Sequence, residues 1–321
     1  MDEIRNKLWA IGGGKGGVGK SIVSLMLGTS LARQGKKVIL VDADLGGSNL
    51  HTLAGIRYPL YTLADFINRQ VENIEDVVMD TPVENMRLIC GADDILGIAN
   101  PKSTQKTRLF NHLKKLEADF IVLDLGAGAS FTTMDFFLFA PNKICVLTPQ
   151  ITSIQNAYGF IKASLYRGLM QIFRGEPEAK EMVRLASSAI EGGSIDSMEK
   201  LKETLRDLDE QFERDLIAYL ESLKIKTIIN MVREDREKEV GNIVKSVADN
   251  YLSLPLENYG FVPYDRVLIN SINQMGEYLK NRKDSISSVS FYGIAGNIIK
   301  NGQPPAIHES RFTVKVPASR L

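Results

Sequence analysis

The sequence predicts a doubly wound α/β fold, in which a mainly parallel β-sheet is flanked by helices. Short apolar runs alternate with helical patterns from residue 7 to about residue 300, as in repeated strand–helix units. A glycine-rich turn at residues 12–19 joins the first apolar run to the next helical pattern. Carboxylates end two later apolar runs, and ligands of open parallel sheets bind at the carboxyl ends of strands. The same residues therefore predict both the fold and the edge of the sheet that carries the site.

The domain organisation follows from length and linkers. The 321 residues would allow two domains at roughly 150 residues each, but no repeat or Pro/Ser-rich linker divides them. We therefore expect one domain over residues 1–301. The connection from about residue 165 to 223 is too long for one crossover, so a helical insertion is expected there. Residues 302–321 are expected to form an irregular tail because they contain Pro304, Pro305 and Pro317.

Composition excludes several classes of protein. The 39 basic residues balance 39 acidic ones, so no overall positive field attracts nucleic acid, although a local basic patch stays open. The two cysteines, Cys90 and Cys145, form no CxxC motif, which argues against a disulfide framework, a zinc ribbon or an iron–sulfur site. We expect both to be small buried apolar residues. No apolar run approaches the roughly 20 residues that span a bilayer, and no apolar signal region begins the chain, so we expect a cytoplasmic location.

The glycine-rich turn has the pattern of a phosphate-binding loop. Residues 14–21 fit G-x-x-x-x-G-K-[ST] in full, between an apolar strand at residues 8–11 and a helix that starts near Lys20. Glycines let backbone N–H groups approach phosphate oxygens, and the helix N-terminus adds a partial positive charge. Lys20 is expected to reach the terminal phosphates and Ser21 to offer its hydroxyl to Mg²⁺. A glycine-rich turn without a ligand is the weaker interpretation.

A second lysine inside the loop makes the pattern more specific. Residues 15–21, K-G-G-V-G-K-S, resemble the deviant Walker A ATPases, a family that includes MinD, ParA and FlhG. The resemblance covers roughly residues 7–300 and implies ATP and Mg²⁺ as cofactors and an ATP-dependent homodimer. It implies that Lys15 acts catalytically on the nucleotide of the partner subunit, much as an arginine finger does. The loop residues expected to bind nucleotide are Gly14, Gly16, Gly17, Val18, Gly19, Lys20, Ser21 and Ile22.

Three aspartates at strand ends complete the predicted chemistry. Asp42 and Asp44 follow an apolar strand at residues 38–41, and strand alternation places both on one face. The resemblance implies that Asp44 orients the attacking water and that Asp42 supports the Mg²⁺ ion. Asp124 ends the run at residues 120–123 and is expected to hold Mg²⁺ through water, as a Walker B aspartate does. The Mg²⁺ residues are therefore predicted to be Ser21, Asp42 and Asp124.

The base of the nucleotide is assigned to two later segments. Asn230 lies near the end of a predicted strand at residues 226–232. It begins an N-x-V pattern whose asparagine, by resemblance to the family, contacts adenine. An N-cap for a helix at residues 233–239 is an equally weighted interpretation of Asn230. Pro263 lies in a segment that resembles the loop closing the base pocket. Gln150 stands where the family pattern has a glutamate, so no role is assigned to a carboxylate there.

The helical insertion contains one long predicted amphipathic helix. A start is expected at Asp196 with Glu199, and apolar residues then recur at intervals of three and four: Met198, Leu201, Leu205, Leu208, Phe212, Leu216 and Leu220. Packing on the chain's own domain is the favoured interpretation of this stripe, and a partner-binding helix is the alternative.

The predicted function is a slow ATPase that dimerises on ATP and positions or regulates a cellular structure, as FlhG-like and MinD-like proteins do. A protein partner is expected, with a flagellar factor as one candidate. Residues 285–300 carry one basic residue, Lys300, so they are expected to form a final core helix, and direct membrane binding is not supported. Two alternatives stay open. One is a ParA-type partitioning ATPase that binds DNA non-specifically, and the other is a nucleotide-loaded scaffold with negligible turnover.

Overall fold

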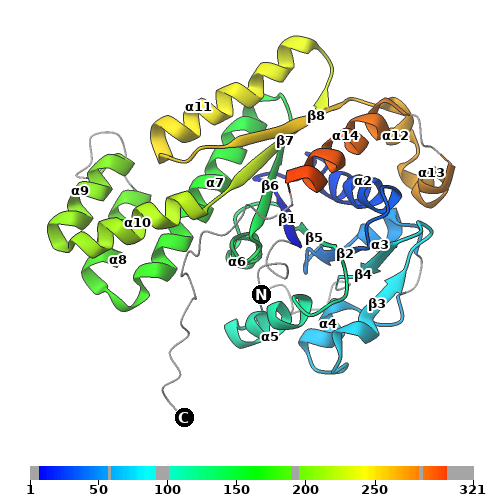
Figure 1. The fold of residues 1–321 in the computed structure, drawn as a ribbon, viewed down its shortest axis with the longest axis horizontal. Helices are drawn as coiled ribbons and strands as arrows, with labels where there is room; N and C mark the ends of the chain where they lie inside the picture. The colour runs from blue at the N-terminus through cyan, green and yellow to red at the C-terminus, as the bar shows by residue number, and fades with distance from the viewer. Residues whose placement is uncertain (1–6, 57–58, 92–100, 189–194, 282–284, 302–321) are drawn as a thin grey trace.

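The computed structural model describes residues 7–56, 59–91, 101–188, 195–281 and 285–301. Over these residues the fold is a twisted eight-stranded sheet with helices on both faces, which confirms the predicted class (Figure 1). The strand order is β3-β4-β2-β5-β1-β6-β7-β8, and every pairing is parallel except that of β3 with β4. The strands are β1 (Leu8–Gly12), β2 (Val38–Ala43), β3 (Val78–Asp80), β4 (Met86–Ile89), β5 (Phe120–Leu125), β6 (Asn142–Leu147), β7 (Ile225–Val232) and β8 (Glu257–Pro263).

The central strands are mainly apolar because both faces of the sheet are covered. Side chains of β1 alternate between two core clusters, with Leu8 and Ala10 in one and Trp9 and Ile11 in the other. The second cluster contains α2 (Lys20–Arg33), α3 (Leu50–Leu53), α12 (Arg266–Asn270), α13 (Met275–Asn281) and α14 (Ile286–Asn301). The first contains α4 (Leu63–Ile67), α5 (Ser103–Leu113), α6 (Phe131–Phe139), α7 (Ile151–Ile172), α8 (Pro177–Ser187), α9 (Met198–Leu208), α10 (Glu210–Ser222) and α11 (Val240–Leu252).

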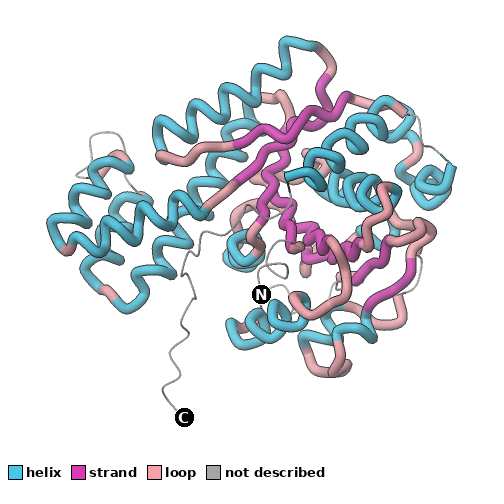
Figure 2. Tube along the Cα trace, viewed as in Figure 1, coloured by secondary structure: helices cyan, strands magenta, loops and turns pink. Residues whose placement is uncertain are grey.

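The order of the strands places the loop after β1 between two neighbouring loops. Because β1 lies between β5 and β6, its carboxyl end is flanked by the segments that lead into α6 and α7. Figure 2 shows these helices and loops gathered around the central strands. Side chains at the carboxyl ends of the neighbouring strands β5, β1 and β6 can therefore meet at one edge of the sheet.

The predicted long amphipathic helix is two helices. α9 ends at Leu208 and α10 begins at Glu210, because Asp209 takes an extended backbone and its carboxylate accepts a hydrogen bond from the Gln211 N–H. The predicted start at Asp196 is also wrong, since the side chain of Ser197 caps α9. Helix α7 continues to Ile172, past residue 165, where the helical insertion is predicted to begin. Figure 1 shows α8, α9 and α10 grouped at one end of the molecule, beyond α7.

The stripe itself packs as the favoured interpretation predicted. Its buried members are Met198, Leu201, Leu205, Leu216 and Leu220, and Phe212 packs partly buried against them. Leu208, at the end of α9, is 41% exposed and does not join the core. The final helix α14 also packs into the core through Phe291, Ile294, Ala295 and Ile298.

The structure also bears on the predictions for the cysteines, for membrane spans and for the C-terminal tail. Cys90 and Cys145 are both buried among apolar residues, as expected. Within the described residues no helix combines the length and the apolarity that a membrane span requires. The predicted tail of residues 302–321 lies outside the described residues.

Candidate functional site

Several glycines of the loop between β1 and α2 leave no room for a side chain. A Cβ on Gly14 would lie 1.8 Å from the Asn156 carbonyl oxygen of α7, and a Cβ on Gly13 would lie 2.7 Å from the carbonyl oxygen of Val146. Gly17 and Gly19 have φ angles of 82° and 86°, which favour glycine. α2 then begins at Lys20 without a side-chain cap on its first N–H groups. These uncapped donors and the close backbone packing suit an anion such as a phosphate.

The two lysines of the loop have opposite environments. Lys20 is 8% exposed and its Nζ lies 3.5 Å from the Lys15 carbonyl oxygen. Burial lowers the pKa of Lys20, and the charges of Asp124 and Asp44 oppose that shift. The Lys15 side chain is exposed, as are Gly16 and Gly17. Lys20 is therefore positioned to face a ligand within its own chain, whereas Lys15 is free to reach outward.

The remaining predicted loop residues anchor the turn. Val18 is 4% exposed, Ile22 packs partly buried against the second core cluster, and Ser21 is half-buried. The loop and the start of α2 are thus fixed on the sheet before any ligand binds.

Asp124 is one of two deeply buried acids of the site. It lies one residue before the end of β5 and is 2% exposed, and its Oδ1 accepts a hydrogen bond of 2.8 Å from Ser24 Oγ of α2. Burial and then the neighbouring charge of Asp42 raise the pKa of Asp124 to about 7, whereas the hydroxyls of Ser21 and Ser24 lower it. A cation close to such a buried carboxyl group favours its ionised form. Its oxygens and the Ser21 hydroxyl suit Mg²⁺, which prefers hard oxygen ligands.

Asp42 and Asp44 contact different parts of the chain. Asp42 is opposite Asp124 in the β2–β5 register and is 1% exposed. Burial raises the pKa of Asp42, and hydrogen bonds from Ser48, Leu50 and Asp44 lower it. Asp44 lies against the backbone after β5, since a Cβ on Gly126 would be 2.8 Å from Asp44 Oδ1. Asp44 is therefore in contact with the segment that follows Asp124.

Asn230 supports the phosphate loop. Its Nδ2 donates a hydrogen bond of 2.9 Å to the Val18 carbonyl oxygen, and a Cβ on Gly19 would meet that same amide nitrogen at 2.5 Å. The next residue, Met231, has a φ of 61°, which breaks the regular pairing of β7 with β8. The alternative interpretation of Asn230 as a helix N-cap is wrong, because Glu234 holds that position before the short 3₁₀ helix at Asp235–Glu239. Pro263 ends β8 opposite Val232, so it lies at the same sheet edge as Asn230.

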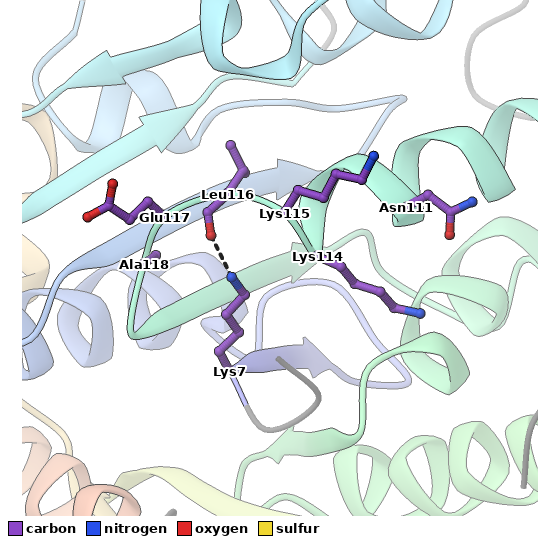
Figure 3. A pocket seen from close by; sticks show the side chains of 7 residues that line it. All are labelled: Lys7, Asn111, Lys114, Lys115, Leu116, Glu117 and Ala118. Atoms are coloured by element: carbon purple, nitrogen blue, oxygen red, sulfur yellow. Dashed lines mark hydrogen bonds between the residues drawn. The ribbon is translucent and has the colours of Figure 1, made fainter. Parts of the chain in front are cut away.

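The hollow drawn in Figure 3 is not part of this site. It is lined by Lys7, Asn111 and residues 114–118, and Lys7 Nζ donates a hydrogen bond to the Leu116 carbonyl oxygen. These residues precede β1 and β5, so they lie at the amino ends of the strands. The phosphate loop follows the carboxyl end of β1, at the opposite edge of the sheet.

Three residues that contact the site were missed from the sequence. Ser24, Ser48 and Asn156 contact Asp124, Asp42 and Gly14, respectively. Ser24 follows Lys20 by four residues on α2, so helical spacing could have placed it on the same face. Ser48 lies in the loop after β2, and Asn156 packs from α7 against the loop at Gly14, and no local pattern reveals either contact.

A family comparison agrees with this geometry. The sequence profile of the CobQ/CobB/MinD/ParA nucleotide-binding domain matches residues 9–276. The chain belongs to this family. As a MinD/ParA-family protein it is an ATP-binding P-loop protein, and the predicted resemblance to MinD and ParA is confirmed.

Individual relatives of this MinD/ParA protein include regulators and cell-division proteins. The antiactivator FleN of Pseudomonas aeruginosa is 31% identical over 291 residues, which are 90% of this chain and 85% of FleN. MinD of Escherichia coli K12 is 28% identical over 204 residues, 60% of this chain and 72% of that protein. The solved MinD of Pyrococcus furiosus, a cell division ATPase, shares the fold with a TM-score of 0.62. That match has 21% identity and covers 92% of this chain and 99% of that one.

Proposed function

We propose that this protein is an Mg²⁺-dependent ATPase that dimerises on ATP and thereby switches a protein partner between two states. The single observation that carries the proposal is the pair of lysines in one loop, with Lys20 buried beside Asp124 and Lys15 exposed. Lys15 forms no ion pair with the described residues of its own chain, so its side chain suits the nucleotide of a second subunit.

The proposed mechanism divides the work among the residues of the site. The backbone N–H groups of residues 14–21 and Lys20 would bind the phosphates, and Ser21 and Asp124 would hold the Mg²⁺ ion. Bound Mg²⁺ supplies charge neutralisation on the phosphates and a fixed orientation of the terminal one. Asp44 accepts a hydrogen bond from the attacking water, and Asn230 keeps the loop in shape through Val18. Asn230 and Pro263 border the base.

The proposed dimer surface lies around the same loop. Phe131 is 66% exposed at the start of α6, and Ile151 is 75% exposed at the start of α7. These helices follow β5 and β6, the two strands beside β1, so the two apolar side chains flank the loop that carries Lys15. Burying each against a second copy contributes about 1.5–3 kcal/mol to association.

The relatives suggest what the dimer does. FleN is an antiactivator, and one solved neighbour from Aquifex aeolicus is a MinC:MinD complex. We infer that the ATP-bound dimer of this chain restrains or positions a protein partner and that slow hydrolysis, stimulated by the partner, ends the contact. A flagellar regulator of the FleN kind is the preferred role, since FleN matches nine-tenths of the chain. Such a switch would work in the cytoplasm.

Two loop variants test the division of labour between the lysines. Lys20→Ala is expected to lose ATP binding, measured by fluorescent-nucleotide titration. Lys15→Ala is expected to bind ATP within about threefold of the unmodified protein but to lose dimer formation and turnover. Equal loss of binding in both variants would contradict the assignment of Lys15 to the partner's nucleotide.

A further inference from the structure

The Asp42 carboxylate is the anchor of the loop that follows β2. Its Oδ2 accepts three hydrogen bonds, from Ser48 Oγ at 2.7 Å and from the backbone N–H groups of Asn49 and Leu50 at 3.1 and 3.0 Å. Its Oδ1 accepts one, from the Asp44 N–H at 3.2 Å. Asp42 thereby satisfies N–H groups at the start of α3, although it precedes that helix by several residues. The N-cap residue, Asn49, makes no side-chain cap of its own.

This arrangement limits what else Asp42 can bind. An ionised carboxylate has about four lone-pair sites, two on each oxygen. Three donors already crowd Oδ2, so only Oδ1 has room for one further donor. The carboxylate therefore acts mainly on the chain itself, and at most one bound water can link it to a metal.

Ser48 is the only side chain among these four donors, and it is tightly packed. A Cβ on Gly91, just after β4, would lie 2.7 Å from Ser48 Oγ and 3.0 Å from the Asp42 carbonyl oxygen. Gly91 thus leaves the space in which the hydroxyl reaches the carboxylate. The other three donors to Asp42 are backbone N–H groups, so Ser48 supplies the side-chain contact to this carboxylate.

The loop held in this way also carries Asp44. The Asp44 N–H donates to one oxygen of Asp42, and its own carboxylate lies against Gly126 and accepts a hydrogen bond of 3.4 Å from the Gly46 N–H. The ring of contacts from Ser48 through Asp42 to the Asp44 backbone therefore sets where the Asp44 carboxylate lies. A shift of about 1 Å in such a group can lower a rate by about a hundredfold.

We propose that Ser48 is a positioning residue for hydrolysis: by fixing Asp42, its hydroxyl holds the loop of residues 44–50 so that Asp44 orients the attacking water. This proposal rests on the proposed ATPase function and deepens it. Ser48 contacts neither nucleotide nor metal in this assignment. Its effect is transmitted only through Asp42 and the loop.

The test combines a measurement without nucleotide and one with it. In nucleotide-free protein, amide hydrogen exchange of peptides covering residues 44–50 is expected to be about tenfold faster in Ser48→Ala, since a hydrogen bond to a charged group is lost. With ATP, kcat is expected to fall about tenfold while the Kd for ATP changes less than twofold. Gly91→Ala, which crowds the hydroxyl, is expected to give the same two changes, and the double variant is expected to be no slower than either single one.

A matched control comes from the same chain. Ser287 Oγ donates at 2.7 Å to Asp265 Oδ2, and Asp265 caps the short helix α12 through the N–H groups of Val267 and Leu268. Ser287→Ala therefore removes the same kind of contact from another capping carboxylate, and we expect no change in kcat or in exchange at residues 44–50. A fall in kcat of the same size in Ser287→Ala would overturn the proposal.

The outcomes separate this inference from the proposed function. Unchanged exchange at residues 44–50 in Ser48→Ala, or a loss of ATP binding that matches the loss of kcat, overturns the role of Ser48. Absence of ATP turnover in the unmodified protein instead contradicts the proposed function. The exchange measurement still decides whether Ser48 anchors the loop in that case.

Discussion

Two glycines near the phosphate site respond differently to the same added methyl group. A Cβ on Gly126 would lie 2.8 Å from Asp44 Oδ1 and 3.0 Å from Asp44 Cγ. Ordinary contact requires about half an ångström more, which the carboxylate gains by rotating away. The fold is therefore expected to lose less than about 1 kcal/mol of stability in Gly126→Ala, since only the end of a flexible side chain moves.

Turnover is expected to change far more than stability in this variant. If Asp44 orients the attacking water, a displacement of about half an ångström corresponds to a roughly tenfold fall in kcat, because about 1 Å corresponds to a hundredfold. ATP binding is expected to stay within about twofold. Phosphate release under saturating ATP and a fluorescent-nucleotide titration measure the two effects separately.

Gly14→Ala is the matched comparison. Its methyl group would meet the Asn156 backbone oxygen at 1.8 Å, so the loop and α7 must separate by more than an ångström. Overpacking against backbone costs about 1–3 kcal/mol or more, and the loop loses its shape. We expect Gly14→Ala to lose ATP binding as well as stability. Unchanged turnover in Gly126→Ala, or ATP binding of unmodified strength in Gly14→Ala, would refute the reasoning.

Three further predictions test packing, ionisation and association. Asp135 of α6 forms ion pairs with Lys106 and Arg167 at 2.7 and 2.5 Å and is 14% exposed, so Asp135→Ala is expected to cost about 2–3 kcal/mol in urea unfolding. Glu117→Ala removes an exposed pair and is expected to change stability little. Burial lowers the pKa of Lys143 from 10.5 to about 7, so between these values the unfolded chain binds a proton that the folded chain lacks. The free energy of unfolding therefore gains up to about 1.4 kcal/mol per pH unit from this residue as pH rises, and Lys143→Met should remove that gain. An identical dependence of the free energy of unfolding on pH in both proteins would contradict this prediction. Phe131→Asp is expected to weaken the ATP-dependent dimer at least tenfold in sedimentation velocity without weakening ATP binding, and an unchanged dimer would place the interface elsewhere.

The parts of the fold that were predictable are those with local signals. Apolar runs identify the buried strands, and the spacing of Gly14 to Ser21 identifies the loop that follows the first of them. Carboxylates at strand ends identify Asp42 and Asp124 because parallel strands end at one edge. Register then brings these two acids opposite each other.

The parts that were not predictable depend on backbone choices or on distant contacts. The apolar stripe of the insertion continues across Asp209, so spacing alone could not reveal the break that its capping carboxylate makes. Asn230 reaches Val18 across 212 positions of sequence, and no local pattern encodes that hydrogen bond. Residues 285–300 were expected to form a core helix, but one face of α14 is exposed. Ile286 and Val289 on that face are each 63% exposed.

We propose above all that ATP joins two copies of this chain through Lys15. Light scattering of Asp44→Ala with ATP and Mg²⁺ tests it most directly, because blocked hydrolysis preserves the bound state. We expect a particle of twice the 35.6 kDa of one chain, which returns to a single chain when Lys15→Ala is added to the variant. A particle of 35.6 kDa for Asp44→Ala at saturating ATP would show that ATP does not join two copies.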